Sequence, residues 1–166
     1  AAMGGDAEVV RALLAKGAYP NINAMGLTPF LVAAGVGAGN RGGTGLAAET
    51  SAGGPMNMEL MELLLQHGAN VNDQVTGTLT YSMRVSRAPS ANEGRTALHI
   101  AAQEGKTDLV RYLLSKSANP DTTDAGGLKP IGLVGTGAQS ASAPPAATPA
   151  SAAEIRSLLQ SAASRK

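Results

Sequence analysis

Cysteine and tryptophan are absent from this 166-residue chain, which has one phenylalanine and three tyrosines. Without cysteine the chain has no disulfide, no thiol nucleophile and no cysteine-ligated metal. Because aromatic rings are so few, Leu, Val, Ile, Met and Ala must fill any core, and such side chains suit closely packed helices. We therefore expect a helical fold rather than a wide β-sandwich.

An excess of one charge is also lacking, since 13 basic residues face 12 acidic ones and the net charge is +1. No block of like charges stands out, so neither general nucleic-acid binding nor attraction to an anionic membrane is predicted. The apolar runs are far shorter than the roughly 20 residues that a membrane span needs. The composition favours a soluble chain whose compartment stays open.

One amphipathic segment recurs along the chain, at residues 8–18, 59–69, 108–118 and, more weakly, 153–159. Its apolar residues lie at positions i, i+1, i+4 and i+5, which is one face of a helix. An acidic residue at the start and Lys or His at the end complement the helix dipole. Gly17 and Gly68 follow the first two copies, where a left-handed C-cap is needed.

A second motif precedes the later copies, at residues 28–34 and 96–102, with a degenerate version at 129–135. Thr28 and Thr96 are good N-caps, and Pro29 is tolerated in a first helical turn. The sequence from Gly94 to Ala102, followed by Gly105 and two apolar pairs, resembles an ankyrin repeat. Thr96 and Lys129 are 33 residues apart, which is the ankyrin period.

The resemblance implies an all-α solenoid of helix-turn-helix units with short β-hairpin fingers. It also implies that His99 bonds the backbone and hydroxyl groups of the adjoining loops. We expect one ankyrin-repeat domain over residues 1–166, divided into a partial repeat 1–26, a repeat 27–72 with insert 35–55, an insert 73–94 with a possible strand 79–85, a repeat 95–127, and a capping repeat 128–166 with insert 136–151. Because Ala1-Ala2 align with Ala101-Ala102, we expect further repeats or another domain before the first.

Two of the inserts have patterns that allow more than one interpretation. Residues 37–42 match G-x-G-x-x-G, but a phosphate loop needs a preceding strand and a following helix. Here a helix precedes the match, so a surface loop is favoured. In the second insert, apolar residues alternate with polar ones over 79–85, which predicts a strand. This strand either folds back onto the repeats or faces a partner. The nearby arginines favour a solvated face, with an acidic partner surface as the alternative.

The third insert, residues 138–151, is rich in Ala, Ser and Pro and is predicted to be a linker. No catalytic, cofactor-binding or metal site is predicted, and the chain is not expected to be an enzyme. His67 ends a helix and His99 belongs to the repeat motif, and no third ligand completes a metal site. The sequence has neither a Gly-x-Ser-x-Gly elbow nor a P-loop.

The resemblance implies a protein-binding module or scaffold, with a concave face built from finger tips and first helices. By motif position and by the finger insert, its contact residues are Met25, Leu27, Tyr81, Arg84, Arg87, Arg95, Gln103, Glu104, Ala125 and Leu128. Two alternatives are a structural subunit of a larger assembly or filament, formed by self-assembly, and an accessory domain of an enzyme encoded upstream. The Ala- and Gly-rich style resembles bacterial ankyrin proteins, some of which are exported.

Overall fold

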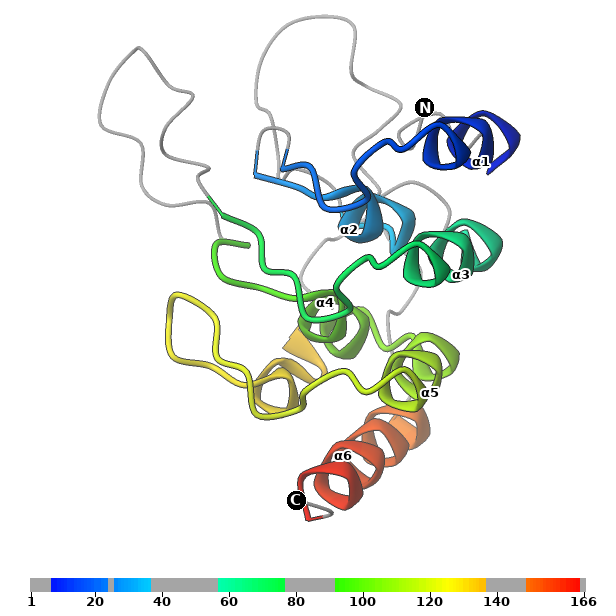
Figure 1. The fold of residues 1–166 in the computed structure, drawn as a ribbon. Coiled ribbons are helices and arrows are strands. Elements are labelled where there is room, and N and C mark those ends of the chain that lie inside the picture. Colours follow the sequence, from blue (N-terminus) through cyan, green and yellow to red (C-terminus); the bar gives the residue numbers. More distant parts are fainter. Residues whose placement is uncertain (1–6, 24–25, 37–56, 77–91, 137–148, 165–166) are drawn as a thin grey trace, which may run out of the picture. The chain divides into compact units, whose positions relative to one another are not determined.

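The computed structural model describes residues 7–23, 26–36, 57–76, 92–136 and 149–164. These residues form the helices α1 (Ala7–Ala15), α2 (Pro29–Ala33), α3 (Met58–Gln66), α4 (Ala97–Gln103), α5 (Thr107–Ser115) and α6 (Pro149–Ala163), with a 3₁₀ helix η2 (Pro130–Leu133) (Figure 1). No strand element is found in the described part of the chain, so the predicted all-α class is confirmed. None of its helices is long and apolar enough to cross a membrane.

The chain divides into two compact units, here named the N-unit (residues 1–93) and the C-unit (residues 94–166). In the N-unit, α3 packs against both α1 and α2. In the C-unit, α4 packs on α5 and η2, and α6 covers α5 and η2 (Figure 1). Each unit thus contains a short helix packed beside a longer amphipathic helix. The single domain over residues 1–166 stays a prediction.

The helices α2 and α3 of the N-unit begin at side chains that accept a backbone hydrogen bond. The Oγ1 atom of Thr28 accepts from the N–H of Leu31 at 3.5 Å, and Pro29 is the first helical residue of α2. The Oδ1 atom of Asn57 accepts from the N–H of Leu60 at 2.9 Å and so caps α3. Thr28 and Pro29 lie where an N-cap and a first helical turn need them.

The amphipathic helices end in left-handed residues. Gly17 and Gly68 have φ angles of 88° and 89°, so the predicted C-caps are confirmed. At the third copy the same place is taken by Ser117, which is the one non-glycine residue with positive φ (67°) among those described. The turn is otherwise the same, since the N–H of Ala118 donates to the carbonyl of Leu113 at 2.9 Å.

Replacing Ser117 with glycine should raise the free energy of unfolding by about 1 kcal/mol, because only glycine adopts this conformation without steric cost. Urea unfolding would measure the change. Gly68→Ser is the matched converse, since a Cβ at Gly68 would meet nothing within 4 Å and the backbone angle alone would act. A loss of stability in the Ser117→Gly variant would contradict this account.

The core is aliphatic, as the shortage of aromatic residues requires. The single phenylalanine, Phe30, is fully buried in the N-unit. The remaining core side chains of the long helices are Val10 and Leu14 in α1, Leu60, Met61, Leu63 and Leu64 in α3, Leu109, Val110 and Leu113 in α5, and Ile155 and Leu159 in α6. Within each helix they are adjacent or three to four residues apart and so lie on one face, as the amphipathic pattern predicts. In α1 only half of the pattern is buried, because Val9 and Leu13 are each 47 % exposed.

The capping repeat differs from the prediction at two places. The degenerate motif at 129–135 forms only the 3₁₀ helix η2, and Val134 after it is extended at φ −60° and ψ 117°. Gly132 lies inside this short helix and disfavours its growth into an α-helix. The predicted linker 138–151 is wrong over residues 149–151, because α6 begins at Pro149, where proline is tolerated and alanines continue the helix.

Several predictions fall outside the described residues. They are the repeat start at residues 1–6, the G-x-G-x-x-G segment at 37–42, the strand at 79–85 and the larger part of the linker.

Candidate partner-binding surface

The finger of the C-unit is closed by one aspartate. The N–H of Asp124 donates to the carbonyl of Leu128 at 2.9 Å, and the carbonyl of Asp124 accepts from Gly127 at 2.9 Å. Its side-chain Oδ1 atom accepts from the N–H groups of Gly126 and Leu128, each at 2.9 Å. Asp124 therefore holds both the turn and the residue that leaves it.

Arg95 forms an ion pair with this aspartate. Its Nε lies 3.4 Å from Oδ2 of Asp124, and its guanidinium also donates to Oε1 of Gln103 at 2.7 Å. The arginine and aspartate side chains are only 11 % and 5 % exposed, so this is a buried ion pair. Burial raises the pKa of Asp124, but the hydrogen bonds from Leu128, Gly126 and Arg95 outweigh it and leave the pKa below its usual value.

His99 joins the start of α4 to the finger. The N–H of Thr96 donates to Nδ1 of His99 at 3.1 Å, and the hydroxyl of Thr96 lies 2.9 Å from the same atom. Because Nδ1 accepts, Nε2 carries the hydrogen and donates to the carbonyl of Leu128 at 3.0 Å. The ring is fully buried, and burial holds the pKa of His99 below its usual value. The imidazole is thus neutral and structural.

Acidification should destabilise the protein in two windows. A buried neutral His99 binds fewer protons than an unfolded one, so the free energy of unfolding should fall below about pH 6.5 and stay level above it. The lowered pKa of Asp124 adds a further loss below about pH 3.8. Urea unfolding against pH measures both. His99→Gln should remove the first slope, whereas His67→Gln should keep it, and an equal slope in both variants would contradict the assignment.

Two glycines complete the framework around α4. Gly94 has a φ of 76°, and a Cβ there would lie 2.5 Å from the backbone nitrogen of Ala125 and 3.0 Å from the carbonyl carbon of Asp124. The finger therefore rests directly on this glycine. Gly105 has a φ of 70° in the turn between α4 and α5.

Leu128 and Ala125 form the tip of this finger. The side chain of Leu128 is 46 % exposed, and Ala125 is exposed beside it. Gln103 ends α4 and is tied to the finger through Arg95, and Glu104 follows it with a 2.7 Å ion pair to Lys106. We name the set of Gln103, Glu104, Ala125 and Leu128 the finger surface.

A family model described as ankyrin repeats in three copies matches residues 35–124. The chain belongs to the ankyrin-repeat family. It is 35 % identical over 80 residues to Protein glp-1 of Caenorhabditis elegans, which covers 48 % of this chain and 6 % of that protein. It is 32 % identical over 91 residues to Protein phosphatase 1 regulatory subunit 27 of Homo sapiens, covering 55 % of this chain and 49 % of that protein. The chain thus spans less than two thirds of these curated relatives.

Some of the residues predicted to contact a partner are buried in the structure, and others lie outside its described part. Leu27 is a correction, because its side chain is only 8 % exposed in the N-unit and offers no surface to a partner. Arg95 lies mostly beneath the finger surface, where its charge is already committed to Asp124. Met25, Tyr81, Arg84 and Arg87 lie outside the described residues.

Asp124 was missed by the sequence reasoning, although a signal for it exists. The stretch Asp124-Ala125-Gly126-Gly127 has the composition of an aspartate-initiated turn.

The other histidine of this ankyrin chain, His67, has its Nδ1 atom 2.9 Å from the carbonyl of Leu63 at the end of α3. No three His, Asp or Glu side chains gather as a metal site within the described ranges.

Proposed function

We propose that this ankyrin-repeat chain is a protein-binding module and that its finger surface is a contact site. Ankyrin repeats generally mediate protein–protein interaction, and such proteins are typically not enzymes. One observation supports the site above all others: Leu128 is exposed although its backbone is fixed on both sides. Its N–H is held by Asp124, and its carbonyl accepts from both Asp124 and His99.

Fixing the backbone before binding favours affinity, because the entropy cost of ordering the loop is already met by the fold. Fully burying an exposed leucine contributes about 1.5–3 kcal/mol, and Leu128, which is 46 % exposed, has about half of that to gain. The residues of the finger surface at the end of α4 are polar, since Gln103 bonds Arg95 and Glu104 pairs with Lys106. An apolar centre with a polar rim is the usual composition of a specific protein interface.

The partner is proposed to be a protein, and the role a regulatory or scaffolding one. The name of the human relative describes a regulatory subunit of a phosphatase. For the present chain this supports the class of function, a non-catalytic subunit that acts by binding. The predicted accessory domain of an enzyme and the predicted assembly subunit remain alternatives.

Capture of proteins from the source cells tests the site. Leu128→Asp should lose the captured protein by at least about tenfold, because a carboxylate would be buried in the contact. Met58→Asp is the matched control, since Met58 is also exposed (37 %) but belongs to α3 of the N-unit. The captured protein is then purified and titrated against both variants. Equal binding by the two variants would contradict the proposed contact site.

A further inference from the structure

Three segments that lead into the short helices begin alike, with a glycine in the left-handed conformation. Gly26, Gly94 and Gly127 have φ angles of 90°, 76° and 76°. The segments lead into α2, α4 and η2, and we name them the return segments. They are residues 26–28, 94–96 and 127–129. Because they share this conformation, they can be compared position by position.

The first return segment is bonded to the segment that follows α3. The N–H of Thr76 donates to the carbonyl of Gly26 at 3.1 Å. Leu27 and Gln74 each form a β-bridge, so the contact has the character of strand pairing. The residues next to the hydrogen bond, Leu27 and Val75, are both buried. The added segment thus supplies one backbone donor and one apolar side chain.

The second return segment is covered in the same way. A Cβ on Gly94 would lie 2.5 Å from the backbone nitrogen of Ala125, so the following finger lies directly against this glycine. The residues next to this contact, Arg95 and Asp124, form the mostly buried ion pair. The covering segment therefore presents a side chain that matches the residue after the glycine, apolar beside Leu27 and acidic beside Arg95.

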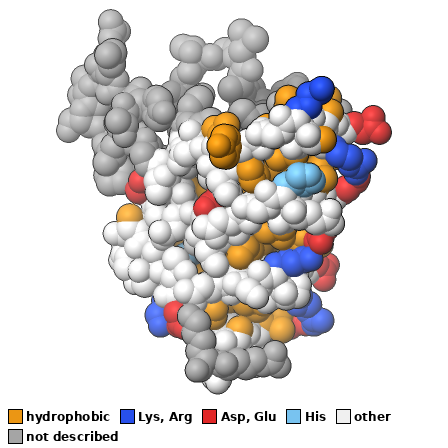
Figure 2. Space-filling model, viewed as in Figure 1, with side chains coloured by type: hydrophobic (Ala, Val, Ile, Leu, Met, Phe, Trp, Pro, Cys, Tyr) orange, Lys and Arg blue, Asp and Glu red, His pale blue; other side chains and the backbone are white. Residues whose placement is uncertain are grey.

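The third return segment has no such cover. A Cβ on Gly127 would meet nothing within 4 Å. Within the part of the chain that the structure describes, no hydrogen bond is made to the carbonyl of Gly127. The next residue, Leu128, is 46 % exposed. Figure 2 shows mostly white backbone and uncharged polar groups over this finger. Its edge therefore offers one backbone acceptor and one apolar side chain.

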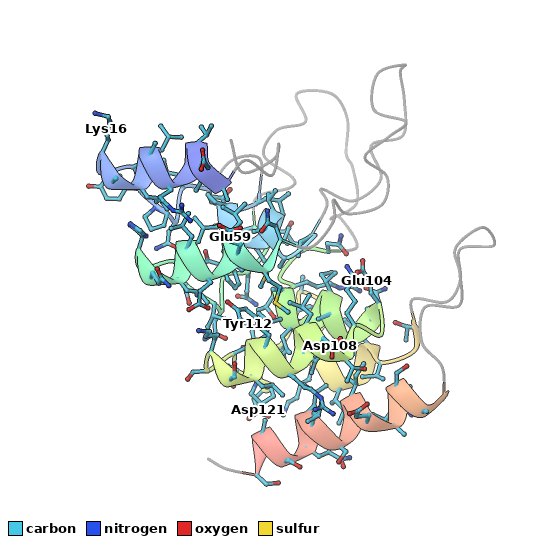
Figure 3. The ribbon with its side chains drawn as sticks, turned by 90° about the vertical axis from the view of Figure 1, so that its right-hand side faces the viewer. Lys16, Glu59, Glu104, Asp108, Tyr112 and Asp121 are labelled. Carbon is cyan, nitrogen blue, oxygen red and sulfur yellow. The ribbon has the colours of Figure 1, made fainter. Side chains whose placement is uncertain are left out.

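The last helix disfavours a further repeat as the occupant of this edge. In the C-unit, α6 lies beside α5 (Figure 3). Two residues after its paired acid, α3 has Met61, which is fully buried, whereas α6 has Arg156 at the same place. Arg156 donates to the carbonyl of Val134 at 3.3 Å, and Gln160 follows it on the exposed side. Stacking a repeat on these polar groups would be costly, so the occupant is assigned to another protein.

We propose that the partner of the finger surface contributes an extended segment, which adds along residues 127–129 as residues 74–76 add along the first return segment. One N–H of this segment donates to the carbonyl of Gly127. The residue before it is apolar, like Val75, and packs on Leu128. In such strand addition the main chain gives affinity and the side chains give specificity. The inference rests on the proposed function, because it takes the finger surface as the contact site.

A synthetic peptide with the sequence of residues 72–76 and capped ends is the probe. Titrated into the isotope-labelled chain, it should shift the amide resonances of Gly127 and Leu128. The dissociation constant should be millimolar, since one short segment supplies the contact. Val75→Asp in the peptide should abolish the shifts, because a carboxylate would be buried against Leu128. In the chain, Leu128→Asp should abolish them too, and Met58→Asp should keep them.

Methylation of single peptide nitrogens tests the backbone bond. A methyl group on the nitrogen of Thr76 should weaken binding about tenfold, because it removes the donor to Gly127. A methyl group on the nitrogen of Val75 is the matched control and should change little, since successive residues of an extended chain point to opposite sides. Equal weakening by the two methyl groups would overturn the proposal.

The outcome for the proposed function is read separately, from protein capture. If capture depends on Leu128 while the peptide shifts neither Gly127 nor Leu128 at millimolar concentration, strand addition is overturned and the contact site stands. If capture ignores Leu128→Asp, the contact site fails, and the proposal that rests on it fails as well. Circular dichroism checks that Leu128→Asp and Met58→Asp are folded, as expected for exposed side chains.

Discussion

Replacing Asp124 with alanine should lower the free energy of unfolding by about 3 kcal/mol, because it removes the carboxylate that neutralises the mostly buried guanidinium of Arg95. The arginine side chain is only 11 % exposed, so water cannot fully replace the carboxylate. The same change removes the acceptor for the N–H groups of Gly126 and Leu128. The finger should then loosen, and capture of a partner through the finger surface should fall with it.

Two further variants separate the causes of this loss. Asp124→Asn keeps an oxygen for the two backbone N–H groups but removes the charge, so its loss should be smaller than that of Asp124→Ala. Asp121→Ala is the control within the same finger, because Asp121 pairs with Lys129 at 3.0 Å and both side chains are well exposed (36 % and 50 %). Exposed pairs contribute less than about 1 kcal/mol. Urea unfolding of the three variants would contradict the argument if Asp121→Ala cost as much as Asp124→Ala.

The helices were predictable because their signals are local. The spacing of residues such as Leu109, Val110 and Leu113 specifies one helix face. Thr28 marks the start of α2, because it caps the N–H of Leu31 only three residues later. The motif match at 129–135 favours an α-helix, but the low helix propensity of Gly132 opposes one, and the segment forms only a 3₁₀ helix. Propensity prevailed there because η2 is too short for packing to override it.

The finger surface was predictable only in part. Ala125, Leu128, Gln103 and Glu104 were assigned by motif position, which places a residue on the repeat but does not say whether its side chain is free. That information depends on residues distant in sequence, as with Arg95, whose partner Asp124 is 29 residues away. The burial of Leu27 could not be predicted for the same reason, because it follows from tertiary packing and not from the local sequence pattern.

Gly94→Ala should produce a loss of stability comparable to that of Asp124→Ala, about 3 kcal/mol, from two causes that add. The first is conformational, since a φ of 76° costs an alanine about 1 kcal/mol. The second is steric, because the new Cβ would lie 2.5 Å from the backbone nitrogen of Ala125. A flexible side chain could move aside, but this neighbour is the main chain of the finger, which is already held by Asp124 and His99.

Gly127→Ala isolates the conformational part of this loss. Gly127 has the same φ of 76°, yet a Cβ there would meet nothing within 4 Å, so only the conformational cost of about 1 kcal/mol should remain. The difference between the two variants in urea unfolding measures the close approach of Gly94 to the finger. Equal losses would mean that the finger does not rest on Gly94. A larger loss for Gly94→Ala, with weaker partner capture, would show that the contact between this glycine and the finger helps to position Leu128.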